Sequence, residues 1–223
     1  MMDLPPSTAF GRKIPKRKFY DNISVSPQLK RVFVEQISQI VWQNKIAPTT
    51  ANIAAGAQVK ELEIIVIKLN QRSFDPKVLS QIDKEIPYHI LFLLEYKDEV
   101  QAWIGFKEAS QTKSGTFKPG TYYHTDWLPS GSLPLRLNGL NMDTVYENFI
   151  RQIAGDRLTS DDMPDAYDIK VAIERDEQRQ KFQREIDALE KKVLSEKQFN
   201  RQVTLNDKLK QLRAEYKALG VKS

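Results

Sequence analysis

Hydrophobic and polar positions follow two different periods in the first part of the chain, and this indicates a mixed fold. Apolar residues recur at helical spacing over residues 27–44, with Ser26 suited to the N-cap and Pro27 to the first helical position. Residues 59–69 instead have apolar side chains on both faces, which is typical of a central strand covered on both sides. We therefore expect helices packed against a sheet.

The segments that follow, up to residue 155, complete this sheet. We expect a short helix from Asp75 or Pro76 to Glu85, strands over 88–96, 100–107 and 121–128, a hairpin turn at 97–99, an exposed loop over 110–120, and a helix capped by Asn141 or Asp143 that ends near Gly155. The predicted fold class is α+β, with a small mixed or antiparallel sheet and flanking helices.

The last part of the chain predicts a coiled-coil-like helical hairpin. Residues 165–219 contain neither glycine nor proline. Two apolar registers step by three and four residues, Phe182–Ile186–Leu189–Val193 and Leu205–Leu209–Leu212–Tyr216–Leu219. They do not join, and the break lies near Ser195, which forms a capping-box pattern with Gln198. Two antiparallel helices are favoured; one continuous helix, on the order of 80 Å long, is the alternative.

The charge distribution marks the other end of the chain. The net charge is +5, and residues 1–45 hold eight Lys/Arg against three Asp/Glu. Clustered cations can neutralise phosphates, and aromatic residues after them can stack on bases. The nucleic-acid-binding candidates are Arg12, Lys13, Lys16, Arg17 and Lys18, and the alternative is a solvated basic surface. The predicted segments are a basic arm (1–25), an α+β domain (26–155), a linker (156–164) and the helical hairpin (165–223).

Composition excludes several kinds of chemistry. Cysteine is absent, which excludes disulfides, Cys-ligated zinc, iron–sulfur clusters and thiol catalysis. The glycines have neither Walker nor dinucleotide-fold spacing, so no cofactor is expected. No apolar run approaches the roughly 20 residues of a membrane span, and the N-terminus lacks the order of a signal peptide. We expect a cytoplasmic protein without a membrane partner.

One pattern in the sheet matches a nuclease core. Asp75 precedes Glu95-Tyr96-Lys97, and an Asp followed by Glu-x-Lys on a strand can hold magnesium and orient a water. Against this, Asp75 is expected to cap a helix and Lys97 to lie in a hairpin turn. A metal-dependent nuclease with Asp75, Glu95 and Lys97 is therefore the second hypothesis.

The bend of the tail is rich in uncharged amides. Amides offer donors and acceptors together, which suits either the backbone of a partner or the stitching of a hairpin turn, and both interpretations stay open. The partner-binding candidates are Lys197, Gln198, Phe199, Asn200, Gln202 and Asn206.

Four segments carry a family resemblance. They are residues 16–20 (Lys-Arg-Lys-Phe-Tyr), Val41-Trp42, residues 86–92 (Ile-Pro-Tyr-His-Ile-Leu-Phe) and residues 197–206. On these, the chain resembles a bacterial family known as domain of unknown function 4391, over nearly its whole length. The resemblance implies no catalytic residues. It does imply a setting beside DNA methyltransferases and helicase-type ATPases in restriction or phage-defence gene clusters.

The leading hypothesis is therefore a non-catalytic accessory subunit of a DNA restriction or anti-phage complex. Its tail would dock to a helicase-type ATPase or DNA methyltransferase, and its basic arm would contact DNA. Self-assembly through the tail, with no other partner, is the third hypothesis.

Overall fold

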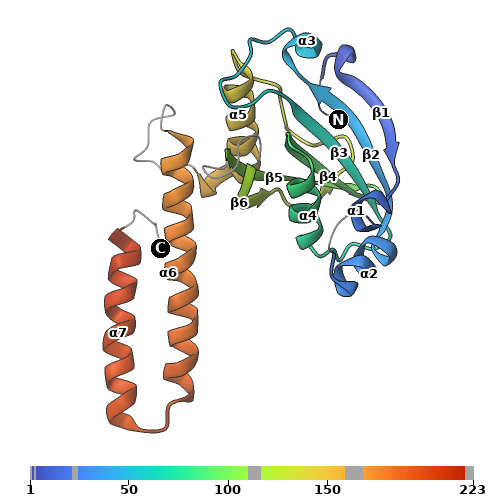
Figure 1. Cartoon of the computed structure of the whole chain (residues 1–223). Coiled ribbons are helices and arrows are strands. Elements are labelled where there is room, and N and C mark those ends of the chain that lie inside the picture. The colour runs from blue at the N-terminus through green and yellow to red at the C-terminus, as the bar shows by residue number, and fades with distance from the viewer. Residues whose placement is uncertain (1, 3, 22–24, 110–116, 159–167, 219–223) are drawn as a thin grey trace. The chain divides into compact units, whose positions relative to one another are not determined.

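The protein forms two compact units in a computed structural model, Met1–Ala154 and Gly155–Ser223 (Figure 1). The structure describes residues 2, 4–21, 25–109, 117–158 and 168–218. The first unit is a mixed sheet with helices and the second a helical hairpin, so the predicted fold class is confirmed.

A seven-stranded sheet organises the first unit, in the order β1-β2-β3-β4-β5-β6 with β7 paired to β5. The strands are β1 (Ala9–Ile14), β2 (Ile37–Ile46), β3 (Leu62–Leu69), β4 (His89–Tyr96), β5 (Glu99–Ala109), β6 (Phe117–His124) and β7 (Leu128–Pro129). Every pairing between these strands is antiparallel except β3 with β4, which helix α4 (Lys77–Glu85) connects. A crossover helix is what a parallel pair requires, because a tight turn cannot return the chain to the same end.

Helices α2 (Pro27–Glu35) and α4 cover one side of the sheet, which we call the helix face. Val32 and Phe33 of α2 pack with Leu79 of α4 in one core. That core includes alternate strand residues, namely Ile40, Ile65, Ile67, Ile90, Phe92 and Leu94. Strand alternation therefore directs Val66, Leu93 and Glu95 to the opposite side. The predicted two-sided burial of the central strand is confirmed, since β3 is buried at every position except Lys68.

Short-range signals set the helix ends. Ser26 Oγ accepts a hydrogen bond from Leu29 N at 3.2 Å, and Asn141 Oδ1 accepts one from Thr144 N at 2.9 Å. Gly155 follows helix α5 (Met142–Ala154) with a φ of +53°, a conformation that favours glycine. The other helical segments of this unit are η1 (Pro6–Thr8), α1 (Lys18–Asp21) and α3 (Pro48–Ala51).

The prediction of one helix over 27–44 is wrong beyond Glu35. Helix α2 stops there, and Ile37–Ile46 is strand β2, paired with β1 on one edge and β3 on the other. The second half of the segment contains Ile40, Val41 and Trp42 in succession, and β-branched and aromatic residues fit a pleated surface better than a helix.

The N-terminal segment is part of the sheet rather than a separate arm, since Ala9–Ile14 forms strand β1. The expected loop over 110–120 and strand over 121–128 are shifted, because β6 begins at Phe117 and ends at His124. Residues 110–116 of that loop lie outside the described residues. The hairpin turn is confirmed at Lys97 and Asp98, with Lys97 at a φ of +52°, whereas Glu99 is the first residue of β5.

The second unit contains η2 (Gly155–Arg157), α6 (Ile169–Ser195) and α7 (Phe199–Ala218). Asp168 caps α6 by accepting a hydrogen bond from Lys170 N at 2.8 Å. Helices α6 and α7 pack together as a hairpin, so the alternative of one continuous helix is wrong. Residues 159–167, most of the expected linker, lie outside the described residues.

Candidate functional site

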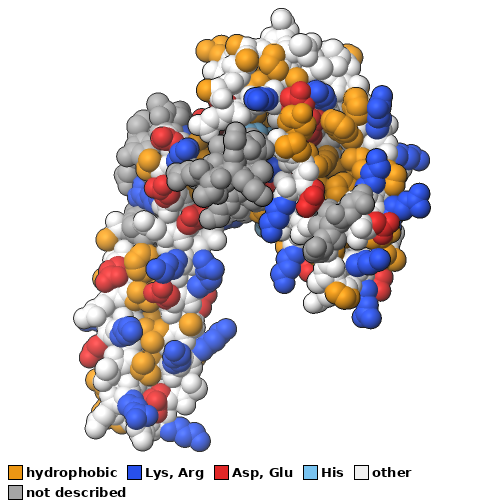
Figure 2. Space-filling model, viewed as in Figure 1, with side chains coloured by type: hydrophobic (Ala, Val, Ile, Leu, Met, Phe, Trp, Pro, Cys, Tyr) orange, Lys and Arg blue, Asp and Glu red, His pale blue; other side chains and the backbone are white. Residues whose placement is uncertain are grey.

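A narrow apolar seam holds the hairpin together. Ile186 and Leu189 of α6 and Leu209 of α7 are buried in it, and Leu205, Leu212 and Tyr216 pack against them. These residues belong to the two apolar registers of the sequence. One charged pair, Arg213 Nη2 to Glu190 Oε1 at 2.7 Å, links the helices beside the seam. Figure 2 shows hydrophobic side chains running along the hairpin between charged ones.

The bend lies where the apolar register breaks, but its local structure differs from the predicted capping box. Ser195 is the last residue of α6, and its Oγ donates to Lys192 O at 3.2 Å instead of capping α7. Gln198 N donates to Glu196 Oε1 at 2.9 Å, and α7 begins at Phe199. Ser195 still belongs to α6, and three residues separate it from the start of α7. It is therefore not the residue next to α7 and does not cap it.

Large apolar side chains are exposed around this bend. Leu194 is 84% exposed, Phe199 75% and Val203 43%. Phe199 and Val203 are four residues apart on α7 and therefore lie on one face of it. We call Leu194, Phe199 and Val203 the hairpin tip. Sequence analysis identified Phe199 but missed the other two, which fall outside the seam registers.

The amide residues of the bend divide into two groups. Gln202 has an internal role, since its Nε2 donates to Val193 O at 3.2 Å and so links α7 back to α6. Lys197, Gln198, Asn200 and Asn206 are exposed. Gln202 therefore stabilises the turn. The other four residues are exposed close to the hairpin tip in the sequence and remain candidates for contact with a partner.

The five basic residues near the N-terminus do not form one surface. Arg12 lies over the ring of Phe10, 4.6 Å from its centroid, whereas Lys13 lines a pocket on the side of the sheet opposite the helix face. Lys16 Nζ donates to Ile37 O at 2.5 Å. Arg17 and Lys18 are exposed at α1. Alternation along β1 thus places the side chains of Arg12 and Lys13 on opposite faces of the sheet. The sequence pattern had indicated a single basic cluster.

The nuclease candidates are also placed apart. Asp75 Oδ1 accepts a hydrogen bond from Lys77 N at 3.0 Å at the start of α4, on the helix face. Glu95 points to the opposite face, where its partner is Lys68 at 3.7 Å. Lys97 lies in the turn, with Nζ 5.3 Å from the ring centroid of Tyr96. Within the described ranges, no three His, Asp or Glu side chains come together as a metal site would require.

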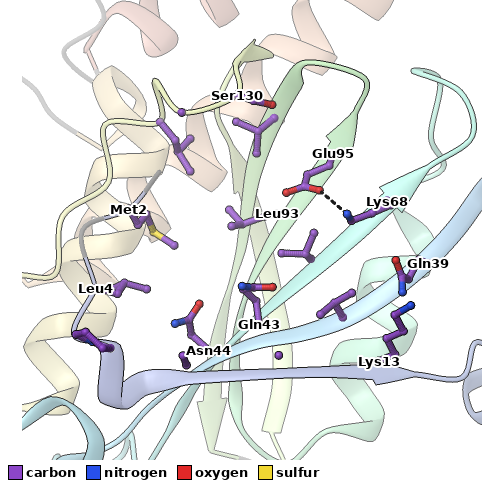
Figure 3. A pocket seen from close by; sticks show the side chains of 18 of the residues that line it. Met2, Leu4, Lys13, Gln39, Gln43, Asn44, Lys68, Leu93, Glu95 and Ser130 are labelled. Atoms are coloured by element: carbon purple, nitrogen blue, oxygen red, sulfur yellow. Dashed lines mark ion pairs between the residues drawn. The ribbon is translucent and has the colours of Figure 1, made fainter.

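A pocket of about 530 Å³ opens on the side of the sheet opposite the helix face, which we call the pocket face (Figure 3). Its floor follows the strand register. Val41, Val66 and Leu93 are aligned across β2, β3 and β4, and Gln39, Lys68 and Glu95 form the next row. Met2 and Leu4 make one wall. The sequence interpretation could not find this pocket, because it assigned the β2 residues to a helix.

A buried ion pair lies between α4 and β5. Lys107 Nζ is 2.7 Å from Asp83 Oδ1, both side chains are 1% exposed, and Lys107 Nζ also donates to Asp83 O, Ile86 O and Tyr88 O where α4 ends. Tyr122 OH donates to Asp83 Oδ2 at 2.6 Å. Burial lowers the pKa of Lys107 and raises the pKa of Asp83, and the attraction between the two charges opposes both shifts. The contacts to the carbonyl groups at the end of α4 indicate a structural role.

A second buried carboxyl lies in β3. Glu63 is 1% exposed, and its Oε2 accepts a hydrogen bond from Trp42 Nε1 at 2.6 Å. Burial raises the pKa of Glu63 to about 7. Glu61 beside it pairs with Lys45 at 2.8 Å. Sequence analysis did not single out Glu63, Asp83 or Lys107, because a lone charge in an apolar strand or helix does not reveal its partner.

The fold and these surfaces define an α+β sheet protein with a helical hairpin. The model of one family, described as domain of unknown function (DUF4391), matches residues 2–215. The chain belongs to this family. No curated protein and no solved structure matches the chain. None of the helices within the described ranges is long and apolar enough to cross a membrane.

Proposed function

We propose that the protein is a non-catalytic accessory subunit that docks to a larger partner through the hairpin tip. The observation that carries the proposal is the exposure of Leu194 and Phe199 at 84% and 75%. Single exposed apolar residues are ordinary, but an aromatic and two aliphatic side chains near one bend indicate an interaction surface. Aromatic side chains are also enriched among the residues that dominate binding energy.

The geometry around the tip supports a protein partner in particular. The seam residues Ile186, Leu189 and Leu209 are buried within the hairpin, so the two helices do not need the tip residues for their own packing. Exposed amides and Lys197 lie near the apolar side chains in the sequence of the bend. An apolar centre with a polar rim is the usual composition of a protein–protein interface.

The partner class in the proposal comes from the family resemblance. It is a helicase-type ATPase or DNA methyltransferase of a restriction or anti-phage complex. The proposal extends to DNA contact by the N-terminal cations, of which Arg17 and Lys18 are exposed, whereas Arg12 and Lys13 lie on different faces of β1 and Lys16 Nζ donates to Ile37 O.

Co-purification of the full chain with any helicase-type ATPase or DNA methyltransferase that is encoded beside it tests the proposal. We expect the unchanged chain to retain one of them and the double variant Leu194→Asp/Phe199→Asp to lose it. Leu140→Asp is the matched control, since Leu140 is 90% exposed in the other unit. Equal retention by the tip variant and the control would refute docking at the tip.

Light scattering on the same variants separates self-assembly from docking. A multimer that becomes a monomer only in the tip variant would favour self-assembly through this surface. If the unchanged chain, the tip variant and the control are all monomers, self-assembly through the tip is excluded and docking to another protein is favoured.

A further inference from the structure

The pocket face offers a site that the docking proposal does not use. The pocket lies over β1, β2, β3 and β4, on the half of the sheet that ends at the β1 edge, and its volume of about 530 Å³ falls in the range of small-molecule sites. Val41 and Leu93 on its floor are only half-buried. Most central strand residues are covered completely, so this apolar floor is available to the body of a ligand.

The charges that line the pocket favour an anion. Lys13 and Lys68 line the pocket together with a single carboxylate among its described residues, Glu95, which pairs with Lys68 at 3.7 Å. Lys13 has no ion pair among the residues that the structure describes. The lining in the described part of the chain thus carries one cation more than it carries carboxylates. A ligand with one negative charge would complement it.

The cations of the pocket lie at one end, and the apolar side chains of Met2 and Leu4 lie at the other, beside Asn44, whose amide donates to Thr8 Oγ1 at 2.9 Å. Figure 3 shows Lys13, Gln39 and Lys68 together on one side and Met2 with Leu4 on the other. Gln39 is an amide that can donate a hydrogen bond to an anionic oxygen beside the two ammonium groups. The pocket therefore has a cationic, hydrogen-bonding end and an apolar end.

We propose that this pocket binds a small organic anion with an apolar body. Lys13, Lys68 and Gln39 contact the anionic group, and Val41, Val66 and Leu93 lie under the apolar body, which extends toward Leu4. The ligand needs both an anionic group and an apolar body. This requirement distinguishes it from a free inorganic anion and from a neutral apolar compound.

Isothermal titration of the full chain with decanoate, below its micelle-forming concentration, tests the proposal. We expect saturable binding of decanoate and at least tenfold weaker binding of decanol and of inorganic phosphate, each of which has only one half of the required chemistry. Equal binding of decanoate and decanol would overturn the anionic end. Equal binding of decanoate and phosphate would overturn the apolar body.

Variants locate the site. Lys13→Glu reverses the charge at the cationic end and is expected to weaken decanoate binding about tenfold or more. Lys97→Glu is the matched control, because Lys97 is exposed in the β4–β5 turn and does not line the pocket. Leu4→Asp, at the opposite end, is expected to weaken binding as well. Unchanged affinity in both Lys13→Glu and Leu4→Asp, or an equal loss in Lys97→Glu, would overturn the proposed location.

Discussion

Lys107 carries a buried charge that we expect to stabilise the fold. Replacing it with Met removes the partner of Asp83 and the donor to three carbonyl groups near the end of α4, while the carboxylate stays in the core. Breaking a buried pair on one side typically costs about 3–5 kcal/mol. We expect Lys107→Met to lower the free energy of unfolding by about that amount, measured by chemical denaturation of the full chain.

Two further variants make this result interpretable. Lys97→Met, at the exposed turn, should change stability by less than about 0.5 kcal/mol. The double variant Lys107→Met/Asp83→Leu removes both charges and should recover part of the loss. A Lys107→Met protein as stable as Lys97→Met would contradict the structural role of the pair.

Glu63 predicts a pH dependence of stability. Its pKa is raised from 4.5 to about 7 in the folded protein, mainly by burial. Between these two pH values, the carboxyl group is protonated in the folded state and ionised in the unfolded state. Its contribution is fully present below pH 4.5 and is lost as the pH rises through 7. Relative to Glu63→Gln, the unchanged protein should therefore lose about 3 kcal/mol of stability between pH 4.5 and pH 8.

The comparison between the two proteins is necessary because His89 titrates in an overlapping range. Burial lowers the pKa of His89 to about 4, so this residue lowers stability as the pH falls below its ordinary value of 6.5. Both proteins retain His89, and the difference in their unfolding free energies isolates Glu63. Parallel pH profiles for the two proteins would contradict the raised pKa.

Strand β2 shows where prediction from sequence fails at the level of elements. Ser26 and Pro27 correctly marked the start of α2, because capping is a local property. The end of that helix depends on β1 and β3, whose backbone groups pair with residues 37–46 on both sides. Those partners are distant in sequence, so the apolar spacing alone could not distinguish a continued helix from a central strand.

The hairpin was more predictable than the sheet, because its pattern lies within each helix and does not depend on partners that are distant in sequence. Its seam depends on spacings of three and four residues within each helix, and the register break located the bend. The exposed Leu194 and Val203 of the tip were missed, although their place outside the seam registers was a sequence signal for exposure. The pocket face is harder still, since Lys13, Val41, Val66 and Leu93 meet only through the strand register.

The division of the chain into two compact units leads to a prediction about the whole molecule. Each unit has its own buried cluster, one around Phe33, Leu79 and Phe92 and the other around Ile186, Leu189 and Leu209. Units with separate cores can unfold separately. Leu209→Ala removes apolar volume from the small seam, at a cost of about 2–3 kcal/mol. It should increase amide hydrogen exchange in α6 and α7 and leave exchange in β3 and β4 unchanged.

Leu79→Ala provides the reciprocal experiment, because Leu79 is fully buried in the core between α4 and the sheet. It should increase exchange in β3 and β4 and leave the hairpin protected. If either variant increased exchange in both units equally, the protein would unfold as one cooperative body. Independent responses would instead mean that the hairpin keeps its structure, and with it the arrangement of Leu194, Phe199 and Val203, even when the sheet unit is destabilised.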